Sequence, residues 1–180
     1  MCKETIQQAV PLWLYYVNAR EALLKANVTR SYKDPERDFA EWLVTKFLGG
    51  KLVDKKNQEN YDVISKNGEK IQVKSIGKSP DNKNGYIITA KDKNNTEASH
   101  YAFVIFKDFI PEVIFIVKKE FIQTFKNKQI KRSDLEVNSE EVFLIKKLFQ
   151  DIKNDGIKPF EWVGDVTEFS KKLREKAWTR

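Results

Sequence analysis

Three polar residues near the middle of the chain have the types and the spacing of a metal-dependent hydrolytic site: Asp62, Gln72 and Lys74. Asp62 supplies a carboxylate and Gln72 a neutral carbonyl oxygen. Mg²⁺ binds through such hard oxygens and fills its remaining positions with water and substrate phosphate. A lysine beside the ion can orient or deprotonate a water, or stabilise charge that develops at phosphorus. Together these residues indicate metal-assisted hydrolysis of a phosphodiester.

A β-hairpin is expected to position these three residues. Residues 61–64 predict a short strand, and residues 66–68 predict a tight turn because Asn-Gly tolerates the positive φ that a two-stranded hairpin needs. Residues 69–76 then return as the second strand. The turn therefore carries the chain from Asp62 back to Gln72.

Side chains on this second strand are expected to alternate between two faces. Ile71 and Val73 point toward the core, whereas Lys70, Gln72 and Lys74 point to the opposite face. The alternation keeps the amide and the lysine on one side of the strand, and the polar face they form is the proposed place of chemistry.

A helix is predicted upstream of the hairpin. Asp34 is expected to be its N-cap and Pro35 its first residue, and Gly49-Gly50 ends it. Glu41 lies inside this helix, and residues 51–53 predict a strand directly after it. The helix is supported by apolar residues at helical spacing, namely Phe39, Leu43, Val44, Phe47 and Leu48.

Asp62 followed by Gln72-x-Lys74 on the next strand resembles the PD-(D/E)XK nucleases, a superfamily with the restriction-endonuclease-like fold. The Gln-x-Lys form is similar to that of the Mrr-type restriction nucleases, in which glutamine replaces the usual second acid. Tyr61 stands where the superfamily often has proline. The order helix, strand, strand with Asp, strand with Gln-x-Lys over residues 34–76 is the order of the superfamily core, which includes a helix with an inward glutamate such as Glu41.

The resemblance implies an α/β fold with a mixed central β-sheet flanked by helices, and a DNA endonuclease that requires Mg²⁺ or Mn²⁺, such as a small type II restriction enzyme. In that mechanism Asp62 bridges the metal, Gln72 and the Val73 carbonyl add ligands, and Glu41 binds directly or through water. Lys74 positions the attacking water. Because Gln72 is uncharged, we expect weaker metal binding or a single-metal site. Cleavage of both strands of a DNA duplex would require a homodimer.

Other interpretations remain open at this point. Glu36, near the start of the helix, is a first-turn acid that complements the helix dipole, and it competes with Glu41 as the helix acid. Glu41 itself and the polar strand face can be solvated surface. At the level of function, the alternatives are a repair, junction-cleaving or RNA nuclease of the same superfamily, and a non-catalytic nucleic-acid-binding module.

Composition narrows the class of protein. The 180 residues are 41% hydrophobic and carry a formal net charge of +7, which indicates one folded domain over residues 1–180 and favours a polyanionic partner. Cys2 and His100 are the only cysteine and histidine, so a disulfide framework and a Cys-based zinc site are excluded. We expect neither a secretory signal nor a membrane span, and hence a cytoplasmic protein.

The rest of the chain predicts supporting elements. Residues 4–26 predict an N-terminal helix that caps the core or pairs two subunits. Residues 77–99 predict either a polar loop that contacts DNA or a solvated hairpin, with a short strand at 86–88. The candidate DNA-binding residues of the loop are Lys78, Asn82, Lys83, Asn84, Lys91 and Lys93.

Downstream of the loop, two apolar runs predict central strands at 101–106 and 113–117. A helix is expected at 118–125, followed by a polar connection at 126–133. Two C-terminal helices are expected at 139–152 and 166–178, the first with Ser139 and Glu141 near its start.

Overall fold

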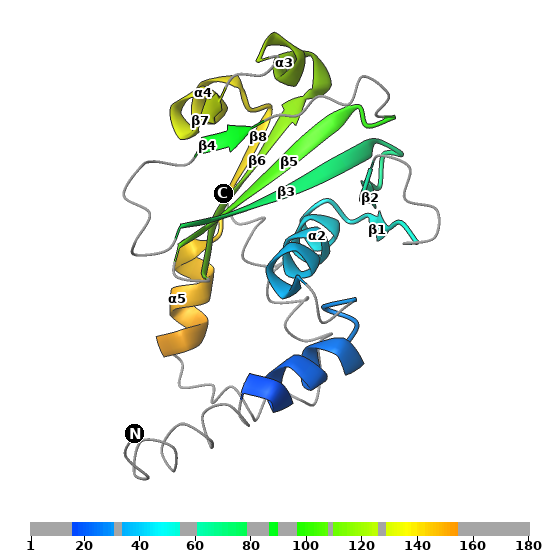
Figure 1. The fold of residues 1–180 in the computed structure, drawn as a ribbon, viewed down its shortest axis with the longest axis vertical. Helices are drawn as coiled ribbons and strands as arrows, with labels where there is room; N and C mark the ends of the chain where they lie inside the picture. Colours follow the sequence, from blue (N-terminus) through cyan, green and yellow to red (C-terminus); the bar gives the residue numbers. More distant parts are fainter. Residues whose placement is uncertain are drawn as a thin grey trace, which may run out of the picture.

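The computed structural model describes residues 16–30, 34–54, 61–78, 87–89, 97–107, 110–125 and 129–154. Over these residues the chain is α/β, with an open mixed β-sheet and helices on both of its faces (Figure 1). The first part of the predicted N-terminal helix and the helix predicted at 166–178 lie outside the described residues. No helix of the described segments is both long and apolar enough to cross a membrane.

The main sheet has six strands in the order β1-β2-β3-β5-β6-β8. Strands β1, β2 and β3 are antiparallel neighbours, β3 and β5 are parallel, and β5, β6 and β8 are again antiparallel. The strand bounds are Lys51–Leu52 (β1), Val63–Ile64 (β2), Lys70–Lys78 (β3), His100–Lys107 (β5), Ile110–Lys118 (β6) and Glu141–Leu144 (β8). The expected mixed sheet is therefore present.

Each face of the sheet is covered by its own apolar cluster. Helix α2 (Pro35–Phe47) packs on one face through Leu43 and Val44, which meet Ile71 and Val73 of β3. Helices α3 (Lys119–Thr124) and α4 (Arg132–Asn138) pack on the other face. There they lie with a second, two-stranded sheet of β4 (Ile87–Thr89) and β7 (Gln129–Lys131). Strands β5 and β6 are therefore buried on both sides, as their apolar runs predicted.

The beginning and end of α2 follow the predicted signals. The Asp34 side chain accepts a hydrogen bond from Arg37 N at 3.0 Å, and Pro35 is the first helical residue. Gly49 has a φ of +60°, which ends the helix and leads into β1. Because both ends are fixed, the buried face of the helix has one orientation over the sheet.

The C-terminal part of the described chain corrects two predictions. The helix predicted at 139–152 is wrong in its first half, since residues 141–144 pair with β6 as strand β8 and only Lys146–Asn154 form helix α5. Ser139 ends α4, donating from its hydroxyl to Leu135 O at 2.6 Å, rather than starting a helix. The run Val142-Phe143-Leu144 suits a strand as well as a helix. It forms a strand because it can pair with the edge of β6.

The predicted polar connection at 126–133 is also wrong, because it contains β7 and the start of α4. Its one apolar residue, Ile130, pairs with β4 and is fully buried in the apolar cluster on the α3 and α4 side of the main sheet. A single buried residue among polar neighbours gives no periodicity, and pairing with β4 is a long-range contact.

Gly50 provides a test of the packing between α2 and the hairpin. A methyl group on Gly50 would lie 2.1 Å from the backbone oxygen of Ile64. We expect Gly50→Ala to lower the free energy of unfolding by about 3 kcal/mol, measured by urea titration. Gly68→Ala is the control: it meets no neighbouring atom, and its φ of +86° predicts a loss of about 1 kcal/mol. Equal losses in the two variants would contradict this packing.

Candidate active site

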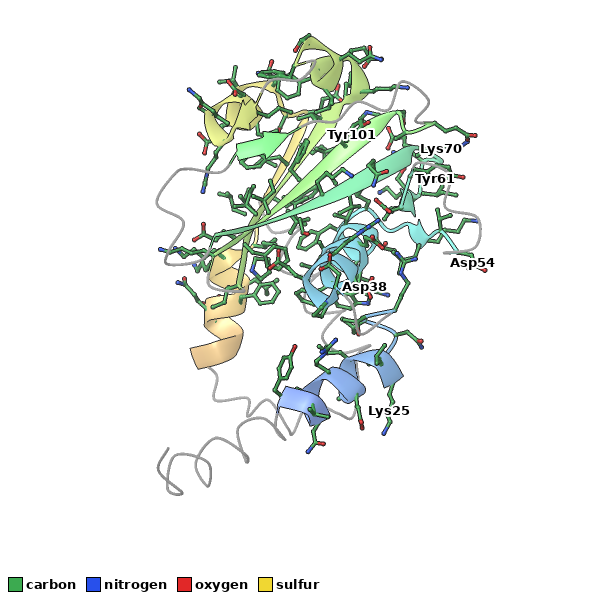
Figure 2. The ribbon with its side chains drawn as sticks, in the orientation of Figure 1. Lys25, Asp38, Asp54, Tyr61, Lys70 and Tyr101 are labelled. Carbon is green, nitrogen blue, oxygen red and sulfur yellow. The ribbon has the colours of Figure 1, made fainter. Side chains whose placement is uncertain are left out.

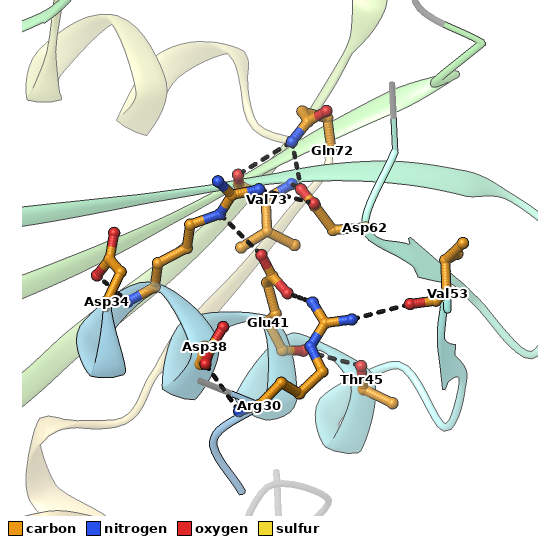
Figure 3. Close-up of polar contacts among 10 residues, drawn as sticks. Arg30, Asp34, Asp38, Glu41, Thr45, Val53, Asp62, Gln72 and Val73 are labelled. Carbon is orange, nitrogen blue, oxygen red and sulfur yellow. Dashed lines mark hydrogen bonds and ion pairs between the residues drawn. The ribbon is translucent and has the colours of Figure 1, made fainter. Parts of the chain in front are cut away.

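The carboxylate of Asp62 lies where strand β2 leaves strand β3. The pairing of these strands covers Val63↔Ile71 and Ile64↔Lys70, and Asp62 comes just before it. Its Oδ2 atom accepts hydrogen bonds from Val73 N, at 2.8 Å, and from Gln72 Nε2 (Figure 3). With 2% of Asp62 exposed, this oxygen is held in a fixed position and the other, Oδ1, is directed elsewhere.

Glu41 projects from the buried side of α2 toward the same place. The residue is 1% exposed, and its Oε1 accepts a hydrogen bond from Arg37 Nε at 2.9 Å. Arg37 Nη2 lies 3.2 Å from Asp62 Oδ1. One guanidinium therefore joins one oxygen of each of the two buried carboxylates.

Arg30 neutralises the other side of Glu41. Its Nη2 forms an ion pair with Glu41 Oε2, and its Nη1 donates to Val53 O at 2.8 Å (Figure 3). Its backbone N–H donates to Asp38 Oδ2 at 2.7 Å. Because these contacts come from both ends of the residue, Arg30 is a fixed counter-ion.

Two buried carboxylates with two guanidiniums satisfy the electrostatic requirement of the site. A buried charge is costly unless it is paired and hydrogen-bonded. The two arginines differ in exposure: the side chain of Arg30 is 17% exposed and that of Arg37 is 47% exposed. Arg30 is therefore part of the packed interior, while Arg37 reaches the site from solvent.

Gln72 acts as a hydrogen-bond donor in this structure. Its Nε2 faces Asp62 Oδ2 and lies 3.4 Å from Val73 O, both of which can only accept. The predicted role of its side chain as a metal ligand would require the amide to turn so that Oε1 faces the site. The structure therefore places Gln72 beside Asp62, where it orients the carboxylate.

The donor set fits a hard divalent cation. Asp62 Oδ1 and Glu41 Oε1 both contact the same cationic group, and carboxylate oxygens are the ligands that Mg²⁺ prefers. Within the described residues there is no cluster of three or more His, Cys, Asp or Glu side chains with metal-binding geometry. A cation here would therefore rest on two acids, with the Val73 carbonyl and water as further oxygens.

Lys74 lies two residues beyond Gln72 on the same strand, and its side chain is exposed. Alternation along β3 places it on the side of Gln72, away from the face that α2 covers. Lys70 shares this face but pairs with Glu97 and lies 4.9 Å from the centroid of the Tyr61 ring (Figure 2).

Glu36, the rival helix acid, lies elsewhere along β3. A methyl group on Gly77 would be 3.2 Å from Glu36 Oε2, so this carboxyl packs against the far half of the strand. Burial raises the pKa of Glu36 above its ordinary value of 4.5, and the nearby Asp34 carboxylate raises it further. Glu41, rather than Glu36, is thus the helix acid that shares Arg37 with Asp62.

Sequence reasoning missed both arginines of the site. The spacing of Arg37 and Glu41, four residues apart on one helix, is a signal that could have identified the first pair. Arg30 had no such signal. The helix over residues 16–25 is followed by a turn in which Asn27 has a φ of +54°, and Arg30 lies three residues beyond it.

Of the predicted DNA-binding residues, Lys78 is the last residue of β3. The others, Asn82, Lys83, Asn84, Lys91 and Lys93, lie outside the described residues. The strand predicted near residues 86–88 is present as β4. The contact of this segment with DNA stays a prediction.

No protein-family model matches the chain, and no curated protein matches its sequence.

Glu36 makes folding stability depend on pH. Its folded pKa is raised, so the folded chain holds this proton more tightly than the unfolded chain, and stability falls as the pH rises from about 4.5 through the folded pKa. Glu36→Gln should therefore be more stable than the wild type at pH 7, with the gain disappearing below pH 4.5. Thermal unfolding at several pH values measures this difference. The exposed Glu136 is the control, and Glu136→Gln should give no gain at pH 7; a gain in both variants would contradict the assignment.

Proposed function

We propose that this protein is a metal-dependent endonuclease of restriction-endonuclease-like fold that hydrolyses phosphodiester bonds in DNA. The observation that carries the proposal is that two buried acids, Asp62 and Glu41, are joined through Arg37, while Gln72 holds the other oxygen of Asp62. An ordinary solvated hairpin would not draw two acids into the interior beside each other. The fold supports the proposal, because α2, β1, β2 and β3 follow one another in the order that the PD-(D/E)XK resemblance implies.

In the proposed site the cation would be Mg²⁺, or Mn²⁺ in its place, and it would supply Lewis-acid activation of the phosphate and of water. Asp62 presents Oδ1 because its Oδ2 is held by Val73 N–H and the Gln72 amide. Glu41 presents Oε1 from the opposite side. These two oxygens set the position of the reacting phosphate relative to β3.

Lys74 has the role of holding the attacking water. Its Nζ donates hydrogen bonds to that water or to a phosphate oxygen, which orients the nucleophile and stabilises charge at phosphorus. Because Lys74 is exposed, a substrate that approaches from solvent can reach it. Asp62 and Glu41 are buried.

The net charge supports a nucleic acid as the substrate. The chain carries 33 Lys and Arg against 26 Asp and Glu, and a basic protein attracts the phosphate backbone before any specific contact forms. We propose double-stranded DNA, and one site per chain then requires a homodimer for cleavage of both strands.

Cleavage of supercoiled plasmid tests the proposal. Wild-type protein should nick or cut the plasmid with Mg²⁺ or Mn²⁺ and leave it intact with EDTA. Asp62→Asn and Lys74→Ala should each lose at least about 100-fold in rate, because each removes a group that acts on the reacting phosphate or water.

Lys70→Ala is the matched control, since it removes a lysine from the same face of the same strand and should retain the wild-type rate. Circular dichroism spectra establish that all variants are folded. Intact plasmid with both metals for the folded wild type, together with intact linear duplex, would overturn the DNA endonuclease. The same assay with branched DNA and RNA then distinguishes another nuclease from a binding module.

A further inference from the structure

Arg37 makes the contacts that a divalent cation would make in this site. Its guanidinium touches Glu41 Oε1 through Nε at 2.9 Å and Asp62 Oδ1 through Nη2 at 3.2 Å. These are the two carboxylate oxygens that face one another, since Asp62 Oδ2 is taken by Val73 N–H and Glu41 Oε2 by Arg30. One positive group therefore already holds both acids.

We propose that Arg37 stands in for the divalent cation while the site is free of metal, and that metal binding releases its guanidinium to a phosphate of the substrate. The proposal rests on the proposed function, because it requires that the site take a metal. It adds a mechanism that makes metal binding and substrate binding depend on each other.

The two arginines of the site differ in how firmly their side chains are held. The Arg30 guanidinium is the fixed one, since it donates to Val53 O and only 17% of the side chain is exposed, and its backbone N–H is held by Asp38. Arg37 can leave, since 47% of its side chain is exposed and both of its side-chain contacts are to the acids themselves. Its backbone stays in place when the side chain turns, because Asp34 caps its N–H. The side chain therefore has a fixed pivot next to the site.

A metal ion and Arg37 cannot share these oxygens. Both groups are cationic, so metal binding at Asp62 Oδ1 and Glu41 Oε1 repels the guanidinium. Once released at the solvent side, the guanidinium can bind a phosphate through two parallel hydrogen bonds. By linkage, a phosphate that holds Arg37 away from the acids strengthens metal binding to the same degree.

Titration with Mn²⁺ in the absence of DNA tests the first half of the proposal. Isothermal calorimetry on the full chain should show Mn²⁺ binding to Arg37→Gln that is about 10-fold tighter than to the wild type, because the internal competitor is removed. Arg37→Lys keeps the charge but cannot reach both acids with one fork-shaped group. We expect it to bind Mn²⁺ several-fold more tightly than the wild type.

Arg132→Gln is the matched control. Arg132 is 37% exposed and pairs with Glu136 four residues along its helix at 2.8 Å, as Arg37 does with Glu41, and its loss should leave Mn²⁺ affinity unchanged. Equal affinity of the wild type and Arg37→Gln would overturn the stand-in role while the proposed function stands. An Mn²⁺ affinity of Arg37→Lys equal to that of the wild type would also overturn the stand-in role, because the positive charge alone, and not the two contacts of the guanidinium, would then set the affinity. Failure of every variant, including the wild type, to bind Mn²⁺ or Mg²⁺ would overturn the proposed function together with this inference.

Binding of a fluorescent duplex tests the second half, measured by anisotropy in the Lys74→Ala background to prevent turnover. Mn²⁺ should increase DNA affinity in Lys74→Ala and should not do so when Arg37→Gln is added. With Mn²⁺ present, the slope of the logarithm of affinity against the logarithm of salt concentration should be smaller by about one in the double variant, which corresponds to the loss of one phosphate contact. An equal increase with Mn²⁺ in both proteins would contradict the release of Arg37 to phosphate.

Discussion

The site depends on how the carboxylate of Asp62 is held at the edge of β3. By accepting hydrogen bonds from Val73 N–H and the Gln72 amide, Oδ2 continues the hydrogen bonding of the sheet past the last paired residue of β2. This contact leaves Oδ1 to Arg37 of α2, which also binds Glu41, and Glu41 in turn pairs with Arg30. If the Asp62 carboxylate were not fixed in this way, Arg37 could not contact Asp62 and Glu41 at the same time.

The sequence predicted helix α2 and the hairpin of β2 and β3 better than the second half of the fold, for a physical reason. Asp34, Pro35 and Gly49 mark the ends of α2 through local backbone preferences, and Asn67-Gly68 does the same for the hairpin. Such signals act over a few residues, so they are visible in a single sequence. Residues 141–144 form a strand because β6 offers a partner, and Ile130 is buried because β4 lies beside it. Those outcomes depend on tertiary contacts that local patterns do not contain.

The residue types of the site were also predictable, while their electrostatic environment was not. Asp62 was proposed from its spacing to Gln72 and Lys74, and Glu41 from the family resemblance; the structure bonds Asp62 to Gln72 and joins Asp62 to Glu41 through Arg37. Arg30 belongs to a turn that precedes α2, and its distance from Glu41 depends on how Asn27 redirects the chain. The charge balance of the interior therefore follows from the path of the backbone rather than from any motif.

The separations along the chain also rank the contacts around the site by their entropic cost. Gln72 and Asp62 are ten residues apart, Arg37 and Asp62 are 25 apart, and Ser99 meets Lys70 across 29 residues where β5 joins β3. The entropy lost in closing a loop grows with its length, so of these three contacts the one within the hairpin forms at the lowest entropic cost. The contact of α2 with Asp62 and the parallel pairing of β3 with β5 close longer loops, and their packing has to offset that larger loss.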